Sequence, residues 1–439
     1  MTPIYIYLWI YLIILFSIVF YVKKTETIED FLISGRNRNW WQIMFSKFAW
    51  AVWVAWFLSY TAYAYDYWFW VYIIILGFLI WYTLFAFWVA PKIYSISKEN
   101  KFYTQWDLVA YKTKCKTSRK VTDIFSSLIQ CTWLLVSTIG GAKIIESLWL
   151  FSYEWAALII LIIVLSYILL WWYKVVLMTD IFQWIVIILL LILISYSIIH
   201  ESSITQILSE QTGTVSIASL IWFFLYGSLV MFALSDRYQL CYAAKDKKSI
   251  QKWMFLTAFP ILIMASLLLL IGLFVHMKNP NLDSSLVFLE AMNHYMPASL
   301  LPLWIVLFFA GLMSSADTSV YSISSHLSLL WKKEDSIKNI KIISIVLIIC
   351  TYIIAYFFRS IIWVTVFWAW MSIVMSIPMI NIVKWWTNSY TFIYSIICWL
   401  AGLFIWIILF WLEPSIILTI VLWGLLGLLF KKRKPVWIK

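Results

Sequence analysis

Two adjacent serines, Ser314 and Ser315, lie within a long apolar stretch of the chain. On a helix, neighbouring side chains point about 100° apart, so both hydroxyls can border one cavity. Gly311 lies one turn earlier, where the absence of a side chain leaves its backbone carbonyl accessible. Hydroxyl and carbonyl oxygens are ligands for a hard cation. A structural role is equally consistent with the spacing, because serines in membrane helices often donate to the carbonyl four residues earlier.

Two carboxylates accompany these serines in apolar surroundings. A carboxylate inside a membrane helix costs about 2.5–3.5 kcal/mol on insertion scales, so it usually faces a cavity or a partner. Asp180 lies about 9 Å from the start of an apolar segment that begins near residue 174, where a helix N-terminus also favours negative charge. It is therefore either a capped interfacial acid or a functional one. Asp317 lies one turn beyond Ser314. Three roles are open for it: contact with an ion, an internal hydrogen bond, or gating.

The elements that must position these residues are membrane helices. Apolar segments of spanning length predict an all-α polytopic membrane protein with about thirteen transmembrane helices. They lie near residues 3–22, 43–66, 69–90, 121–147, 153–171, 174–199, 216–243, 252–277, 298–330, 340–358, 361–383, 391–411 and 415–430. The first segment lacks a basic leader and a small-residue cleavage site, so we interpret it as a span rather than a signal peptide.

The distribution of basic residues predicts the orientation of these spans. All but five of the 32 Lys and Arg fall in the loops and the tail that lie inside if the N-terminus is outside. Lys and Arg concentrate on the cytoplasmic side of membrane proteins. We therefore expect a multi-pass protein of the plasma membrane with an external N-terminus and a cytoplasmic C-terminus.

Composition argues against several other classes of protein. The chain of 439 residues is 64% hydrophobic and 12% charged, which is far from a soluble domain. Its five cysteines form no C-x-x-C pair, its four histidines have no metal-ligand spacing, and no phosphate-binding loop or nucleophile elbow is present. We therefore do not predict an enzyme. The net charge of +12 belongs to the expected cytoplasmic face and does not indicate a nucleic-acid partner.

The chain has an unusual excess of tryptophan. It contains 31 Trp and only 11 Gly, although glycine averages about 7% and is more frequent still in membrane helices. Several tryptophans fall inside spans rather than at the interfaces, among them Trp50 and Trp53, and the pair Trp171-Trp172 occupies a tight junction. A hypothesis is that many of them are glycines in the living protein, from a genetic code that reads UGA as glycine. The alternative is a truly tryptophan-rich membrane protein.

Several motifs, in order along nearly the whole chain, resemble the sodium:solute symporter family. From the N-terminus onward they are Phe31-Leu32-Ile33-Ser34-Gly35-Arg36, Val89-Ala90-Pro91-Lys92 followed by Tyr103-Thr104 and Asp107, the Trp171-Trp172 pair, the helix start Thr179-Asp180-x-x-Gln183, and Ala310-Gly311-Leu312-Met313-Ser314-Ser315-Ala316-Asp317-Thr318-Ser319. The chain departs from the family at Leu240, where Arg usually follows Gln, and at Leu330, where an acid is common. These departures concern coupling rather than the fold.

The resemblance implies a LeuT-like fold. Its core would be two inverted five-helix repeats, residues 43–199 and 216–383, within a single transporter domain spanning 1–439. Segments 1–42 and 391–430 would be peripheral, and 431–439 a basic cytoplasmic tail. The first helix of each repeat would be interrupted, at Phe48–Trp53 and at Tyr226-Gly227-Ser228, since unwound backbone at membrane depth lines cavities and binds ions.

The same resemblance implies a sodium site and a mechanism. Backbone carbonyls of Ala49 and Val52 would complete a Na⁺ site with Gly311, Ser314 and Ser315, and Asp180 and Asp317 would take part in coupling. The cargo ion Na⁺ would drive symport by alternating access. Lys47 leaves an alternative open: it either snorkels to the cytoplasmic face, or replaces the ion in a proton-coupled or sodium-independent carrier.

The solute is only broadly indicated. The expected walls of its pocket are Trp53, Trp56 and Tyr226, and the mostly apolar surroundings favour a small amino acid such as proline, or a monocarboxylate, over a sugar. No obligate protein partner is evident beside the solute and the lipid bilayer. A second alternative is a transporter-like solute sensor; the chain ends nine residues after Phe430, without the signalling domain expected of one.

Overall fold

The computed structural model describes residues 2–21, 29, 33–51, 54–147, 150–170, 173–209, 215–295, 297, 301–331, 336–384 and 389–410. Throughout these ranges the regular elements are helices, and none is a β-strand, as the all-α prediction requires. The chain forms two compact units. The first comprises residues 1–72, 130–214 and 253–365, and the second comprises residues 73–129, 215–252 and 366–439.

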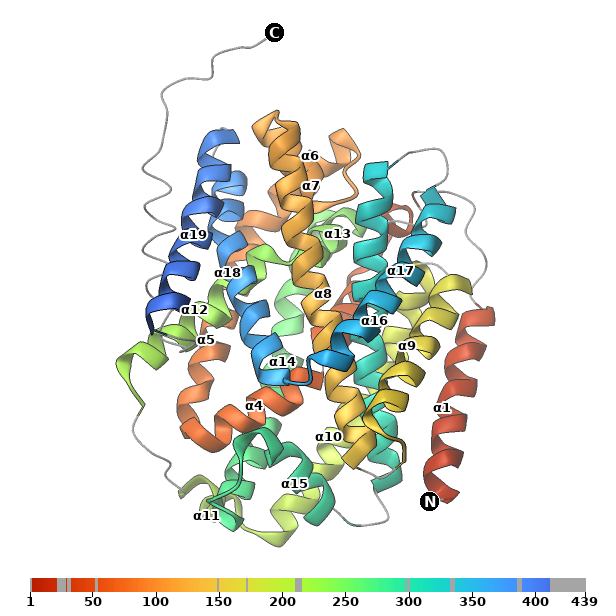
Figure 1. Ribbon diagram of the computed structural model, residues 1–439, viewed down its shortest axis with the longest axis vertical. Coiled ribbons are helices and arrows are strands. Elements are labelled where there is room, and N and C mark those ends of the chain that lie inside the picture. The colour runs from red at the N-terminus through yellow and green to blue at the C-terminus, as the bar shows by residue number, and fades with distance from the viewer. Residues whose placement is uncertain are drawn as a thin grey trace. The chain divides into compact units, whose positions relative to one another are not determined.

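The first unit contains the helices that follow the N-terminus and most of the chain's middle (Figure 1). They are α1 (Thr2–Tyr21), η1 (Ser34–Arg36), α3 (Trp40–Ala51), α4 (Val54–Tyr67), η2 (Trp68–Val71), α9 (Tyr153–Leu170), α10 (Tyr173–Glu201), α11 (Ile204–Ser209), η4 (Ser284–Leu286), α15 (Val287–His294), α16 (Leu301–Trp331) and α17 (Ser336–Phe357).

The second unit contains α5 (Tyr72–Leu84), the π-helical turn η3 (Phe85–Val89), α6 (Ala90–Asn100), α7 (Gln105–Thr113), α12 (Ile217–Ala233), α13 (Ser235–Ala243) and α19 (Ser389–Phe410). Three long helices begin in one unit and end in the other: α8 (Lys116–Ser147), α14 (Lys247–Lys278) and α18 (Ile361–Lys384).

Many of the helices suit a bilayer. Within the described ranges, five helical segments are long and apolar enough to cross a membrane, and the bent pair α12–α13 would be a sixth. Four shorter apolar segments lie in α1, α9, α18 and α19. The total of thirteen spans stays a prediction, and the last of them, 415–430, lies outside the described residues.

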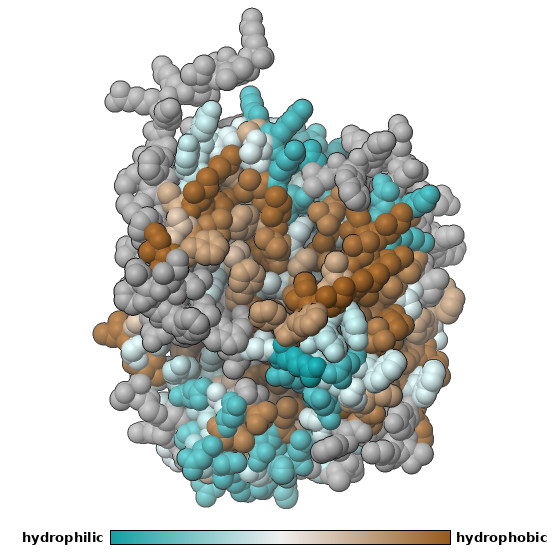
Figure 2. Space-filling model, in the orientation of Figure 1, coloured by the Kyte–Doolittle hydropathy of each residue, from teal (hydrophilic) through white to brown (hydrophobic). Residues whose placement is uncertain are grey.

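The outer surface of α17 has the character expected next to lipid. Figure 2 shows apolar atoms along this helix, and its exposed residues include Ile342, Val346, Ile349 and Ile353. A soluble protein rarely exposes so continuous an apolar face. The opposite side of α17 packs on α16, where Ser344 donates a hydrogen bond to Ser324 at 2.9 Å.

Helix α16 is the centre of the first unit. It contacts α1, α3, α9, α10 and α17, and its polar residues from Ser314 to Ser328 are almost all fully buried. Gly141 of α8 lies so close to it that an added Cβ would meet Leu312 Cδ1 at 1.9 Å. Small residues at helix crossings allow such close approach in membranes.

The break in the seventh predicted span does not lie where the sequence suggested. Helix α12 runs without interruption through Tyr226-Gly227-Ser228, so the expected interruption there is wrong. The chain instead breaks at Leu234, which has extended φ/ψ, and α13 continues at an angle of 50°. Gly227 serves a different purpose: an added Cβ would lie 2.0 Å from the Ile74 carbonyl oxygen of α5. It is a packing glycine rather than a hinge.

Candidate functional site

The centre of the candidate site is a hydrogen bond between two helices of the first unit. Ser314 Oγ of α16 donates to Asp180 Oδ1 of α10 at 2.7 Å. Both side chains are completely buried. The structure thus joins a residue predicted to bind sodium with one predicted to act in coupling, although 134 positions separate them in the sequence. The Ser314 hydroxyl thus reaches a neighbouring helix, whereas the alternative role was a bond to the backbone of its own helix.

Ser315 behaves differently from its neighbour. Its hydroxyl donates to the Gly311 carbonyl at 3.2 Å, which is the structural role that the sequence left open. The next turn repeats this pattern, because Ser319 donates to the Ser315 carbonyl at 2.9 Å and to Gln130 Oε1 of α8 at 3.4 Å. The Gly311 carbonyl and the Ser315 hydroxyl are therefore close to each other and to the buried turn that holds Ser314.

Two side chains that sequence reasoning did not assign to the site approach it from α1 and α10. Gln183 lies one turn after Asp180 and donates to the Tyr11 hydroxyl at 3.1 Å. Tyr11, stacked on Phe182, interacts electrostatically with both Asp180 and Asp317. Gln183 belonged to a recognised motif, but nothing in the sequence pointed to Tyr11, which sits in an otherwise apolar helix. The first helix therefore contributes a polar group close to the buried acids.

Asp317 is fully buried on α16, and its Oδ1 accepts a hydrogen bond from Thr318 at 3.3 Å. An ionised carboxylate in apolar surroundings attracts a small cation strongly, since charges interact more strongly where water is excluded. In the described part of the chain, no group of three or more His, Cys, Asp or Glu side chains forms a metal site, so hydroxyls and carbonyls would have to supply the remaining ligands.

The other predicted sodium ligands lie at or beyond the edge of the described helices. Ala49 is in α3, which ends at Ala51, and α4 begins at Val54. Val52 and Trp53 fall between them, outside the described residues, as does the Lys47 side chain. Helix α3 itself packs against both α10 and α16, the two helices that carry the Asp180–Ser314 pair.

The predicted substrate residues Trp56 and Tyr226 belong to different units. Trp56 of α4 stacks on Tyr60 with ring centroids 5.2 Å apart. Tyr226 of α12 stacks on Trp222 at 5.2 Å and meets the edge of Trp368 at 6.0 Å. Tyr226 is half-buried in this aromatic group. A pocket that combines Trp56 with Tyr226 stays a prediction.

Comparisons with known proteins bear on the fold. No family model and no curated protein matches the chain. A solved structure of a Na⁺-coupled sialic acid symporter, in a substrate-bound outward-open state, is similar over 99% of both chains, with a TM-score of 0.79 and 17% identity. A nucleobase-cation-symport-1 family transporter, in a closed conformation with bromovinylhydantoin bound, is similar over 92% of this chain and 94% of its own, with a TM-score of 0.63 and 11% identity. Both are transporters, and the chain has the LeuT-like transporter fold that its sequence predicted.

Proposed function

We propose that the protein is a sodium-coupled symporter of the sodium:solute symporter family that imports a small organic solute across the plasma membrane. The observation that carries this proposal is the buried hydrogen bond between Ser314 and Asp180. A carboxylate is rarely left at such a position without a function, because its burial is costly. The likeness to a Na⁺-coupled sialic acid symporter and to a second cation symporter supports the choice of sodium.

The proposed ion site contains one formal negative charge from Asp180 and neutral oxygens from Ser314, Ser315 and Gly311. The Ser314 hydroxyl donates a hydrogen bond to the Asp180 carboxylate. When sodium enters, the hydroxyl can rotate and present its lone pairs to the ion. The carbonyls of Ala49 and Val52 would complete the ligand set, as the family resemblance implies. Asp317 would stabilise the bound charge from one turn away.

This arrangement would couple the ion to the solute through alternating access. Sodium entering from outside would stabilise the outward-open state, and the solute would then bind near the middle of the membrane. Ion and solute would then leave together on the inner side. At a membrane potential of 100 mV, each inward positive charge supplies about 2.3 kcal/mol, before any sodium gradient is counted.

A small amino acid such as proline, or a monocarboxylate, is the proposed solute. Trp56 and Tyr226 each lie beside another aromatic side chain. Such apolar residues suit a small solute with few polar contacts, whereas a polyhydroxylated sugar needs many directional hydrogen bonds. Sialic acid is the substrate of the similar symporter, and we do not extend it to this chain.

The proposal is tested by uptake of radiolabelled solutes into proteoliposomes. We expect an inward sodium gradient to drive accumulation of at least one amino acid or monocarboxylate, and potassium in its place to abolish it. Accumulation driven by a proton gradient alone would favour the alternative carrier that uses Lys47. Saturable binding of a solute with no transport under any gradient would indicate a sensor.

We also propose that some of the tryptophans are glycines in the living protein. Trp68 follows α4 directly and has a φ of 52°. Helices commonly end on a glycine in this left-handed conformation, which is unfavourable for a bulky side chain. The indole N–H of Trp68 is also buried without a hydrogen-bond partner, as is that of Trp370. A buried donor with no acceptor is costly, and glycine would remove both problems.

Mass spectrometry of the protein purified from its native cells tests this second proposal. We expect the peptide that spans position 68 to have the mass of a glycine-containing peptide. Tryptophans encoded by UGG serve as the internal control and should keep their mass. A tryptophan found at position 68, or a UGG codon there, would contradict the proposal. Glycine at 53 or 56 would also enlarge the expected pocket, so these peptides should be measured in the same experiment.

A further inference from the structure

The break between α12 and α13 leaves backbone carbonyls that need partners. Helix α12 ends at Ala233, and α13 begins at Ser235. The last four carbonyls of a helix receive no hydrogen bond from an N–H of the same helix, and water or side chains normally donate to them instead. Every residue from Gly227 to Ala244 is buried. Side chains must therefore supply the donors.

Gln105 supplies them from α7. Its Nε2 donates to the carbonyls of Phe232 and Ala233, each at 3.3 Å, and the Tyr238 hydroxyl donates to the same Phe232 carbonyl at 2.9 Å. An amide nitrogen has two hydrogens, so one side chain can serve both carbonyls. Ser126 Oγ of α8 donates to Gln105 Oε1 at 2.6 Å, which fixes the orientation of the amide. The Gln105 side chain is completely buried.

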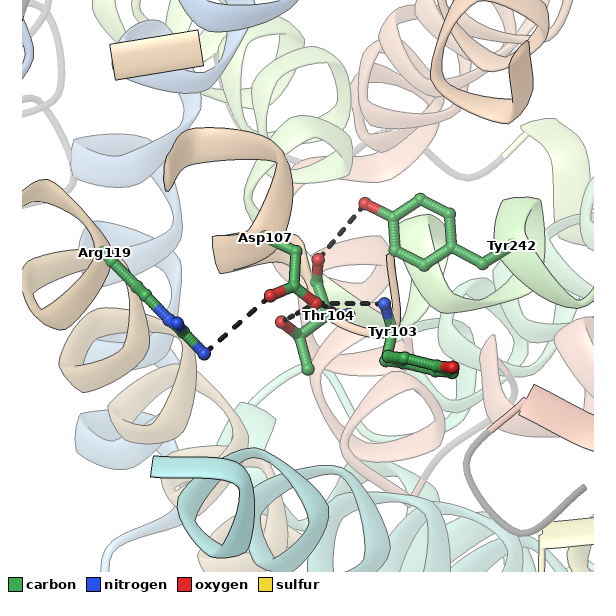
Figure 3. Close-up of polar contacts among 5 residues, drawn as sticks. All are labelled: Tyr103, Thr104, Asp107, Arg119 and Tyr242. Carbon is green, nitrogen blue, oxygen red and sulfur yellow. Dashed lines mark hydrogen bonds and ion pairs between the residues drawn. The ribbon is translucent and has the colours of Figure 1, made fainter. Parts of the chain in front are cut away.

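The first turn of α7, which carries Gln105, is itself fixed on two sides (Figure 3). Asp107 Oδ2 accepts from the backbone N–H groups of Tyr103 and Thr104 at 3.0 and 2.9 Å, which forms a capping box. On one side, Arg119 of α8 lies 3.9 Å from Asp107 Oδ1. On the other side, the Tyr242 hydroxyl of α13 donates to the Thr104 carbonyl at 3.2 Å. This turn therefore joins α8 to the broken helix.

We propose that Gln105 is a positioning residue that sets the bend between α12 and α13, and that the first turn of α7 couples this bend to α8. If the bend at Leu234 changes, either α12 carries the two carbonyls away from the Gln105 amide or α13 carries the Tyr238 hydroxyl away from the Phe232 carbonyl. In both cases a buried carbonyl loses a donor. An unsatisfied buried carbonyl is unfavourable, so the bend and the position of α7 must change together. The role is conformational and goes beyond the proposed transport function.

The reporter for this proposal is Cys241, a native residue of α13 that is completely buried. In a background in which the other four cysteines are replaced by serine, the rate at which a membrane-permeant maleimide labels Cys241 measures how often α13 opens. We expect Gln105→Leu, which keeps the size but removes the amide, to raise that rate about tenfold. Gln105→Glu should also raise it, because a buried carboxyl group is protonated and its single O–H can serve only one of the two carbonyls. Ser126→Ala should give a smaller rise.

Thr113→Val is the matched control on the same helix. The Thr113 hydroxyl is also buried, but it donates to the Val109 carbonyl within α7. We expect the control to label at the parent rate. A parent-like rate in Gln105→Leu, or an equal rise in Thr113→Val, would overturn the proposal. If Gln105→Leu does not fold, the comparison of Ser126→Ala with Thr113→Val decides. None of these measurements requires transport, so their outcome is independent of the sodium mechanism.

Discussion

Replacing Asp180 with asparagine is expected to lower sodium-driven uptake at least about 100-fold. Asparagine keeps the shape of the side chain and an oxygen that can accept from Ser314, but it removes the negative charge. A cation in a buried site depends strongly on such a charge, since the effective dielectric constant is low there. Loss of about 3 kcal/mol of ion binding corresponds to a factor of about 100.

The measurement is the initial rate of solute uptake as a function of sodium concentration in proteoliposomes. We expect Ser314→Ala to raise the half-saturating sodium concentration by about tenfold, and the double replacement of Ser314 and Ser315 to abolish sodium dependence. Ser328→Ala is the control: this buried hydroxyl of α16 donates to the Ser325 carbonyl of its own helix. Unchanged sodium-driven uptake in Asp180→Asn would refute the proposed ion site.

The sequence identified residues of this site but not the hydrogen bond between them. Asp180 and Ser314 were each recognised as polar residues in apolar segments, which is a local property. Their hydrogen bond depends on how α10 packs against α16, and no local pattern encodes that. The expected ligand set was neutral, and the structure shows a carboxylate in contact with one of its members, Ser314. Tyr11 was missed because it is one of four tyrosines in an apolar helix, and nothing in the sequence distinguishes it from a membrane-facing aromatic residue.

The fold was predictable in its class for a physical reason. Apolar runs of spanning length, and the concentration of Lys and Arg in alternate loops, are features of many residues together. They can be recognised even where the role of a single residue is ambiguous. Helix interruptions are harder to predict, because they depend on where buried carbonyls find donors. The break at Leu234 is possible where Gln105 reaches the freed carbonyls, and Gln105 lies far away in the sequence. A glycine inside a span is consequently weak grounds for a hinge.

Replacing Gly227 with alanine is expected to destabilise the protein by about 3 kcal/mol. The added Cβ would lie 2.0 Å from the Ile74 carbonyl oxygen and 2.8 Å from its carbon. Both are backbone atoms of α5, so relief requires the two helices to move apart. Overpacking of a close contact typically costs about 1–3 kcal/mol, occasionally more. The midpoint of thermal unfolding in detergent should therefore fall by several degrees.

Two further variants turn this expectation into a graded test of what the glycine does. Gly77→Ala places its Cβ 2.6 Å from the Phe224 carbonyl oxygen and should have a smaller effect than Gly227→Ala. Ala218→Val adds bulk at a half-buried position of the same helix and should leave the midpoint unchanged. A hinge glycine would behave in the opposite way, because alanine at an unstrained helical position stabilises by about 0.4–1 kcal/mol through the unfolded chain. A midpoint that stays level or rises in Gly227→Ala would show that α5 and α12 accommodate a Cβ at this position and would contradict the role of Gly227 as a packing glycine.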